Sequence, residues 1–481
     1  MVTSERRKWL ALALLSAVQF MVVLDIAIVN VALPSIKDDL GFSQENLQWV
    51  ISAYALVFGG VLLLGGRAAD VLGRRRIFLA GIVLFTLASL FAGLAWSEGS
   101  LIGARAFQGL GAAIISPAAL SILSTTFAEG RERNIALGVW GAVGGFGAAA
   151  GVLLGGILTD ALSWEWIFFV NVPVGVTAFV LTPFLLTESR DARVKRFDVP
   201  GAVLVTGGLS SLVYAITQAG QEGWLAGRTV GFGAAALALL VAFVAWELRH
   251  PEPLMRLGIL RIRTVSGANV AGFIMGTAMF SMFLMLTLYM QQVLGYSAMK
   301  TGVAYLAVAG TAIVWSAVAA QFVTRVGVKP VLVAGMTFLT GGLVYFTQVS
   351  VGGSYLGDLL PGFLLIAVGI GFSFVPISIA ALAGVQASEA GLASGLINTS
   401  QQIGGALGIA ALSTIATSRT NDAVAAGTAL PSALVHGFTG AFLAGVGIAA
   451  VGIVAALTLI RRDELEQVPQ PEVEPALDLA A

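Results

Sequence analysis

Stretches of about 20 apolar residues follow one another through nearly the whole chain, and each is long enough to cross a bilayer as a helix. Hydrophobic residues make up 57% of the sequence and charged residues only 11%, whereas a soluble domain carries about 25% charged residues. A water-soluble fold of 481 residues cannot bury so much apolar surface. The sequence therefore predicts an all-α integral membrane protein.

The hydropathy pattern predicts fourteen membrane-spanning helices. The first apolar stretch follows Arg6, Arg7 and Lys8 as in a signal peptide, but it continues to Pro34 and is too long for one, so we expect a retained span. The expected spans are residues 9–34, 47–66, 77–97, 100–127, 134–159, 165–186, 199–219, 229–248, 265–292, 300–324, 328–349, 356–382, 391–416 and 437–460.

The distribution of Lys and Arg predicts the orientation. If the N-terminus is cytoplasmic, the outer loops hold only Lys37, Arg228, Lys300 and Arg419, and Arg105 lies within a span. All the other basic residues, of 26 in total, then fall on the inner side, as the positive-inside rule requires. This alternation predicts an even number of spans, two cytoplasmic termini and a cytoplasmic-membrane location.

A weak internal repeat predicts two halves. GRAADVLGRR at 66–75 aligns with AQFVTRVGVK at 320–329. Repeated halves around a central site are typical of secondary transporters. We expect a six-helix bundle at 1–186, a linker with two inserted spans at 187–264, a second bundle at 265–460 and a disordered cytoplasmic tail at 461–481.

Several kinds of chemistry lack the residues that they need. The chain has no cysteine, and its two histidines, His250 and His436, fall in predicted loops, so we expect neither a metal site nor a histidine proton relay. The net charge of zero gives no reason to expect nucleic acid. No Gly-Lys pair of a phosphate loop occurs. We therefore predict a transporter without a cofactor, driven by an ion gradient or working downhill.

Asp25 and Arg105 are the ionisable residues expected deep inside spans, near the outer ends of the first and fourth helices. Charges at membrane depth are costly and usually functional. The hypothesis is that Asp25 alternates between an ionised state paired with Arg105 and a protonated state in which the pair opens and substrate competes. The alternative is a static buried pair that fixes helix packing.

Two glycine-containing segments are interpreted as moving parts. The loop after the second span, with Gly66, Asp70, Gly73, Arg74 and Arg75, could latch one conformation if Asp70 meets the positive N-terminal end of the helix near Gly391. The alternative is a plain basic inner loop. The fifth span carries close-packing glycines, which indicate either tight static packing or a deformable helix between the halves. These glycines are Gly147, Gly151, Gly155 and Gly156.

A methionine-rich ninth span suggests a cavity for varied apolar compounds, although lipid contact explains it equally well. Polar side chains on the ninth and thirteenth spans either bond between helices or line the path. The candidate cavity residues are Gln108, Met275, Met279, Phe283, Phe374, Asn398 and Gln401.

These motifs resemble those of the fourteen-helix drug:proton antiporters of the major facilitator superfamily. The similar segments are LDIAIVNVALP at 24–34, the loop at 66–75, LIGARAFQGLGAA at 101–113, SWEWIFFVNVPVG at 163–175 and GLASGLINTSQQIGGALG at 391–408. The resemblance implies two six-helix bundles that rock around a cavity and export small amphipathic compounds in exchange for protons, with Asp25 as the membrane acid. Without this resemblance, composition and residue spacing predict only an ion-coupled transporter and leave the direction of transport open.

Three positions depart from the family pattern, and one of them is Glu165, where the family commonly has Arg. Val152 replaces the usual proline of the fifth-span antiporter motif, and Val71 replaces a basic residue of the inner loop. With one acid and one Arg in mid-span, the cavity favours neutral or monocationic substrates. The alternative function is a proton-coupled uptake permease for a specific metabolite, because a fold does not fix direction or substrate. A monomer is expected.

Overall fold

The computed structural model describes residues 4–43, 46–127, 131–189, 198–251, 253, 257–385 and 390–461, and these residues form helices and turns without a strand. The first part comprises α1 (Ser4–Leu40), α2 (Trp49–Leu72), α3 (Arg74–Gly93), α4 (Glu98–Thr126), α5 (Arg131–Ala161), α6 (Trp166–Phe169) and α7 (Asn171–Leu185). An inserted pair follows, α8 (Val199–Glu222) and α9 (Gly227–Glu247). The last part comprises η1 (Leu257–Arg261), α10 (Arg263–Leu288), η2 (Tyr289–Val293), α11 (Ala298–Val326), α12 (Val328–Phe346), η3 (Tyr355–Leu359), α13 (Leu360–Ala380), α14 (Ala390–Ala425) and α15 (Leu430–Leu459).

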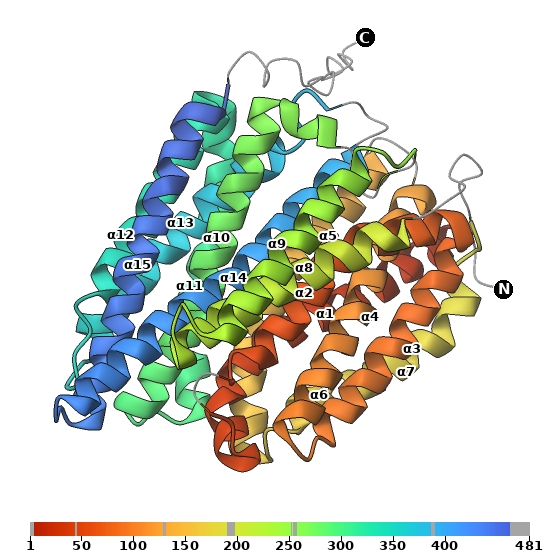
Figure 1. The fold of residues 1–481 in the computed structure, drawn as a ribbon. Helices are drawn as coiled ribbons and strands as arrows, with labels where there is room; N and C mark the ends of the chain where they lie inside the picture. The colour runs from red at the N-terminus through yellow and green to blue at the C-terminus, as the bar shows by residue number, and fades with distance from the viewer. Residues whose placement is uncertain are drawn as a thin grey trace, which may run out of the picture.

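Each of the fourteen expected spans falls on a helical segment, and the prediction of an all-α fold with two bundles and an inserted helix pair is confirmed (Figure 1). Eleven of the described helices are long and apolar enough to cross a membrane. The number of crossings stays a prediction. The expected tail at 461–481 lies outside the described residues after Arg461.

Three helix boundaries differ from the expectation. The first helix continues through Pro34 to Leu40. The sixth span is broken at Val170 into α6 and α7. The prediction that His436 lies in a loop is wrong, because α15 begins at Leu430 with Pro431 in its first turn, a position that proline favours. His436 is therefore a helical residue at the start of the last span.

Two bundles of antiparallel helices, α1–α7 and α10–α15, lie side by side (Figure 1). The first bundle is centred on buried aromatic residues such as Phe78 and Phe85. In the second bundle the rings of Phe363 and Phe442 each lie 5.6 Å from that of Phe346. One pair meets edge to face and the other is tilted, and ring contacts at this distance add to the energy of burial alone.

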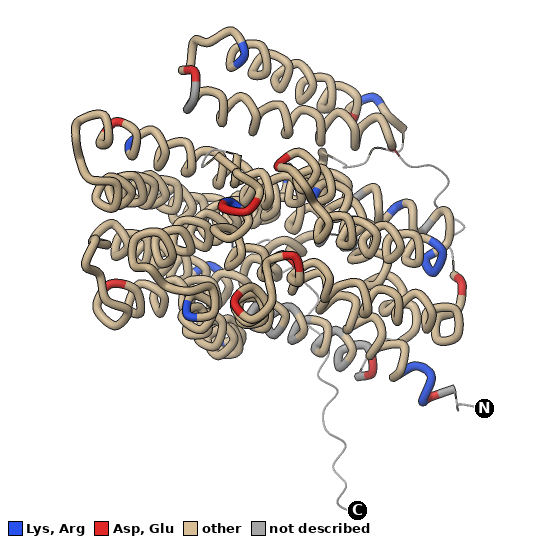
Figure 2. Tube along the Cα trace, turned by 90° about the horizontal axis from the view of Figure 1, so that it is seen from below, with Lys and Arg blue, Asp and Glu red and all other residues tan. Residues whose placement is uncertain are grey.

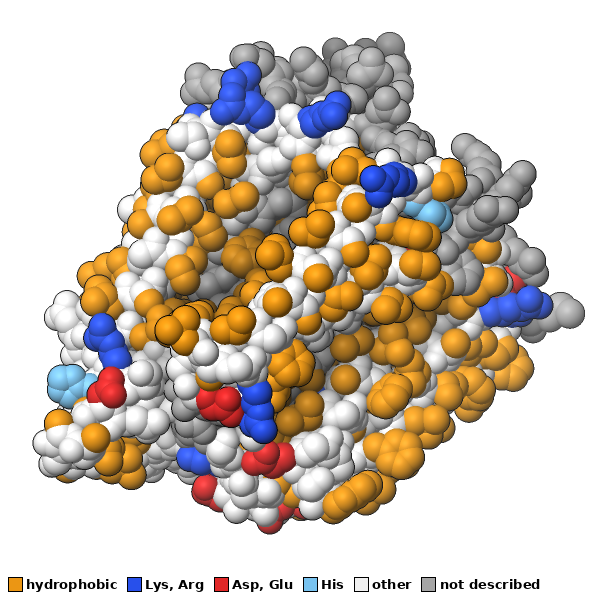
Figure 3. Space-filling model, viewed as in Figure 1, with side chains coloured by type: hydrophobic (Ala, Val, Ile, Leu, Met, Phe, Trp, Pro, Cys, Tyr) orange, Lys and Arg blue, Asp and Glu red, His pale blue; other side chains and the backbone are white. Residues whose placement is uncertain are grey.

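The bundles meet along two helix pairs, α2 with α14 and α5 with α11. Near the end opposite the termini, Gln291 Nε2 donates to Val31 O at 2.8 Å, and Met299 N donates to Asp160 Oδ2 at 2.9 Å. Figure 3 shows a hollow in the half nearer the termini, beside the C-terminal bundle. The described contacts between α5 and α11 lie at the end away from the termini, which we call the distal end.

The inserted helix α8 lies over the seam between the bundles. It shares a buried cluster with both neighbours: Ala55 and Leu56 come from α2, Leu209 and Val213 from α8, and Ala406 and Ala410 from α14. Gln48 Nε2 donates to Thr217 Oγ1 at 3.0 Å, and Thr414 Oγ1 donates to Ile216 O at 3.3 Å. Adjacent residues of α8 therefore bond to opposite bundles.

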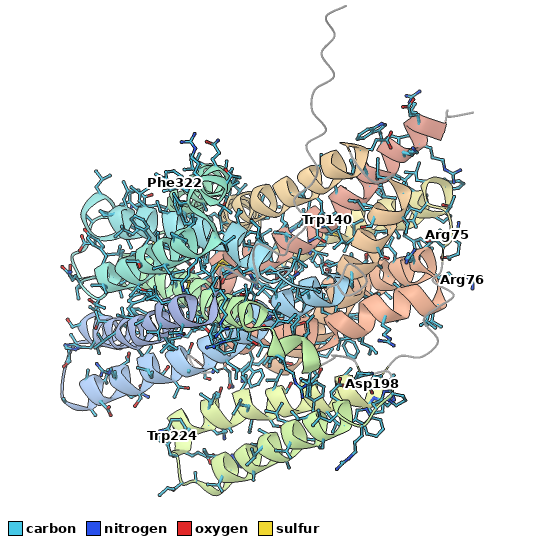
Figure 4. The ribbon with its side chains drawn as sticks, turned by 90° about the horizontal axis from the view of Figure 1, so that it is seen from above. Arg75, Arg76, Trp140, Asp198, Trp224 and Phe322 are labelled. Carbon is cyan, nitrogen blue, oxygen red and sulfur yellow. The ribbon has the colours of Figure 1, made fainter. Side chains whose placement is uncertain are left out.

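The second inserted helix, α9, packs on α8 and turns its other face outward, where Leu237 is 67% exposed. At its end, Trp246 Nε1 donates to Asp198 Oδ1 at 2.8 Å, and Gly201 N donates to the same oxygen (Figure 4). Burial acts to raise the pKa of Asp198, but these hydrogen bonds hold that pKa below its ordinary value of 3.8. Asp198 thus caps α8 and ties it to α9.

Charged residues fall mostly near helix ends and connecting loops, with long uncharged stretches between them (Figure 2). Large apolar side chains cover much of the outer surface, and Phe184 of α7 is 71% exposed. Such a surface is stable only against lipid. The chain is therefore a multi-pass membrane protein.

Candidate functional site

The structure brings Asp25 of α1 and Arg105 of α4 into direct contact inside the first bundle. Arg105 Nη1 lies 2.7 Å from Asp25 Oδ2, and the two side chains are 1% and 0% exposed. A charge-assisted hydrogen bond of this length is among the strongest side-chain contacts. The expected salt bridge is therefore present.

Amide side chains complete the surroundings of the carboxylate. Gln108 Nε2 and Asn171 Nδ2 donate to Asp25 Oδ1 at 2.6 and 2.9 Å. Gln108 Nε2 also lies 2.7 Å from Ser89 Oγ, and Gln108 Oε1 accepts from Arg105 Nη1 at 2.7 Å. Asp25 thus accepts three hydrogen bonds from side-chain nitrogen atoms.

Arg105 is held on its other side by α2 and α6. Its Nε donates to Val50 O at 2.9 Å. Its Cζ lies 4.4 Å from the ring centre of Tyr54 and 5.7 Å from that of Phe168. Val50 and Tyr54 are one helical turn apart, so they present the carbonyl and the ring on one face of α2.

Glycines allow the helices to approach closely enough for these contacts. A Cβ at Gly109 would overlap the carbonyl oxygen of Tyr54, and one at Gly111 would lie 2.7 Å from the backbone nitrogen of Phe85. These glycines let α4 pack tightly on α2 and α3. The break between α6 and α7 at Val170 places Asn171 at the first turn of α7, beside Asp25.

This arrangement can bind and release a proton at one defined place. As long as Asp25 is ionised, the pair is neutral and its polar atoms are largely satisfied. Protonation of Asp25 would remove the counterion of the buried Arg105, and breaking a buried pair costs about 3–5 kcal/mol. A change of charge at Asp25 would therefore act on the contacts that join α1, α2 and α4.

The inner loop between α2 and α3 is tied to the end of α7 within the same bundle. Glu188 Oε1 accepts from Arg75 N at 3.1 Å, and Arg76 Nε lies 3.7 Å from Glu188 Oε2 (Figure 4). Arg74 N donates to Ser189 O at 3.0 Å. Gly73 has φ of +111°, which a side chain would disfavour.

The predicted latch can be followed only in part. Gly66 lies in α2 beside Pro117 of α4. The side chain of Asp70 and the packing around Gly391 lie outside the described part of the structure, so the expected docking of Asp70 stays a prediction.

The glycines of α5 face two different neighbours. Gly147, Gly151 and Gly155 pack on α1, and a Cβ at Gly151 would lie 2.8 Å from Ala27 Cβ. Gly156 packs on the start of α11, where a Cβ would lie 2.6 Å from Met299 Cα. Three glycines therefore serve packing within the first bundle, and the fourth serves the contact between bundles.

The candidate cavity residues are not brought together as one surface. Gln108 belongs to the Asp25 network, and Met275 is buried in the core. Met279 and Phe283 are partly buried against that core, and Phe374 of α13 is 51% exposed. On α14, Asn398 is exposed, while the backbone of Gln401 packs on Gly276 of α10. Their contact with substrate stays a prediction.

Sequence reasoning missed Ser89, Asn171, Tyr54, Phe168 and Glu188. Phe168 and Asn171 lie inside the SWEWIFFVNVPVG segment. The resemblance of that segment to the family motif could have identified both residues as candidates. Ser89 and Tyr54 are ordinary residues of apolar helices and give no signal in one sequence.

A comparison with protein families now adds to this geometry. The profile described as Major Facilitator Superfamily matches residues 15–409. The chain belongs to this superfamily. It is therefore a transporter and not an enzyme.

Curated relatives of this facilitator cover most of its length. It is 41% identical to the puromycin resistance protein of Streptomyces alboniger over 98% of this chain and 95% of that one. It is 40% identical to the cephamycin export protein of Amycolatopsis lactamdurans over 85% of each. It is 35% identical to the tetracenomycin C resistance and export protein of Streptomyces glaucescens over 86% of this chain and 77% of that one.

Solved structures support the fold alone. A peptide transporter in complex with sulfate matches with a TM-score of 0.67 at 15% identity, over 93% of this chain and 94% of that one. A bacterial homologue of the human lysosomal transporter Spinster, inward-facing and unoccupied, matches with a TM-score of 0.64 at 14% identity, over 94% and 98%.

Proposed function

We propose that this facilitator exports a small amphipathic compound, such as an antibiotic, across the cytoplasmic membrane in exchange for protons. The buried pair of Asp25 and Arg105 supports this proposal, because it places a titratable carboxyl group among the contacts that join three helices. The named export and resistance roles of the relatives support the outward direction. Both termini then face the cytoplasm, in accord with the placement of basic residues.

The proposed cycle uses alternating access. With Asp25 ionised, the pair is closed and the binding region faces the cytoplasm, where substrate enters. Once the transporter faces outward, a proton from outside neutralises Asp25, the pair opens and substrate leaves. Moving one charge through the membrane potential supplies about 2.3 kcal/mol per 100 mV. That energy supports accumulation against a gradient.

The test uses inverted membrane vesicles acidified inside by respiration. Puromycin, a cephamycin, tetracenomycin C and lipophilic cations are added one at a time while the internal pH is followed. We expect at least one compound to dissipate the pH gradient with the wild type and none to do so with Asp25→Asn. An equal response from Asp25→Asn, at matched protein levels, would show that Asp25 is structural.

A further inference from the structure

Two aromatic rings enclose the guanidinium group of Arg105 and have no part in the pairing with Asp25. Tyr54 of α2 lies 4.4 Å from Arg105 Cζ and is 2% exposed. Phe168 of α6 lies at 5.7 Å and is fully buried. A cation over a ring face at such distances is attracted by the negative face of the ring, and more strongly where water is absent.

The ring of Tyr54 is placed for this contact by its backbone. Its carbonyl oxygen abuts Gly109 of α4, which brings the two helices together one turn beyond Arg105. The hydroxyl of Tyr54 is buried and makes no hydrogen bond among the described residues. A buried hydroxyl without a partner is costly. Tyr54 therefore contacts Arg105 through the face of its ring and not through its hydroxyl group.

The contact matters most when Asp25 is neutral. In the ionised state, Arg105 has a full counterion at 2.7 Å. After Asp25 binds a proton, the contacts left to the cation are Val50 O, Gln108 Oε1 and the two rings. Arg105 and Tyr54 are the charged and titratable side chains that face Asp25 from the described helices around it. The rings thus stabilise the protonated state more than the ionised one.

We infer that Tyr54, together with Phe168, is a positioning residue that holds Arg105 at the coupling site while Asp25 carries its proton. The inference rests on the proposed function in its choice of Asp25 as the proton-binding group. It assigns a role to the aromatic part of the SWEWIFFVNVPVG segment and to α2. Because α2 also contacts α14, the ring of Tyr54 keeps Arg105 attached to a helix at the seam between the bundles.

The test measures protonation of Asp25 directly in purified protein reconstituted into lipid. Infrared spectra recorded over a range of pH follow the carbonyl band of the protonated carboxyl group, which is assigned by its absence in Asp25→Asn. Loss of the ring in Tyr54→Leu makes the protonated state less stable, so we expect half-protonation about one pH unit lower than in the wild type. Tyr54→Phe keeps the ring and should titrate as the wild type does.

Phe58→Leu is the matched control. Phe58 is buried one turn beyond Tyr54 and packs on it with ring centres 5.8 Å apart, whereas the rings described over Arg105 are those of Tyr54 and Phe168. Its loss should cost packing but leave the titration of Asp25 unchanged. If Tyr54→Leu does not fold, Phe168→Leu replaces it, with a smaller shift expected in the same direction.

Wild-type titration in Tyr54→Leu, or an Asp25 that never takes up a proton, would overturn the inference. Failure of the vesicle exchange while Asp25 titrates as described would overturn the proposed function and leave the role of the rings standing.

Discussion

At the scale of single residues, Asp25 and Arg105 are each costly without the other. Arg105→Leu leaves a buried carboxylate without its cation, and we expect it to lower stability by about 3–5 kcal/mol. The double variant Asp25→Leu and Arg105→Leu removes both charges and should recover most of that loss, while transport stays abolished. Thermal unfolding of the purified variants measures these differences in stability. A double variant that is less stable than Arg105→Leu would contradict the prediction.

The sequence predicts this pair because charges are rare inside apolar spans. It does not predict Ser89, Asn171 or Tyr54, because small polar and aromatic side chains occur in many membrane helices. Their function depends on which faces of α2, α3 and α7 meet α1 and α4, and this is decided by packing. Glu188 was missed for a similar reason: a carboxylate in a basic loop has many possible partners until the fold brings Arg75 to it.

At the scale of helices, the distal contact between α5 and α11 depends on small residues. A Cβ at Gly302 of α11 would overlap the carbonyl oxygen of Val152, so Gly302→Leu should separate these helices. The natural chain contains no cysteine, so Ala298→Cys is a single reporter at this contact. We expect Gly302→Leu to increase its labelling by a membrane-impermeant maleimide several-fold.

Gly310→Leu is the matched control for that experiment. It lies on the same helix, and a Cβ there would meet no atom within 4 Å. It should leave the labelling of Ala298→Cys unchanged. Equal labelling in both variants would show that the α5 and α11 contact does not close this end.

The seam position of α8 gives a second prediction at this scale. Cross-linking Gln48→Cys to Thr217→Cys with a short bifunctional reagent tethers α8 to α2, and we expect transport to continue. Adding a cross-link between Ile216→Cys and Thr414→Cys ties α8 to α14 as well, which joins the two bundles through α8. Because rocking requires the bundles to separate, transport should then stop and return on cleavage. Continued transport with both links would show that α8 does not bridge moving parts.

At the scale of the whole molecule, the sequence predicts where the helices begin and end better than it predicts which of their residues line a cavity or join the bundles. Span positions follow from hydropathy, so α1–α15 lie close to the expected ranges. The residues that line a cavity cannot be predicted from hydropathy. Met275 and Phe374 are both apolar, but Met275 is buried and Phe374 is half-exposed. The bridging place of α8 also depends on contacts with two distant segments, α2 and α14, which one sequence does not reveal.

The most direct test of the account is to follow substrate and protons together in proteoliposomes that contain the purified transporter and an internal acid buffer. The radiolabelled compound is one that dissipated the gradient in vesicles. We predict that it accumulates inside only while the interior is more acidic, with protons leaving in a fixed ratio, and that Asp25→Asn abolishes accumulation. Accumulation that is indifferent to the pH gradient, or equal in Asp25→Asn, would contradict proton exchange at Asp25.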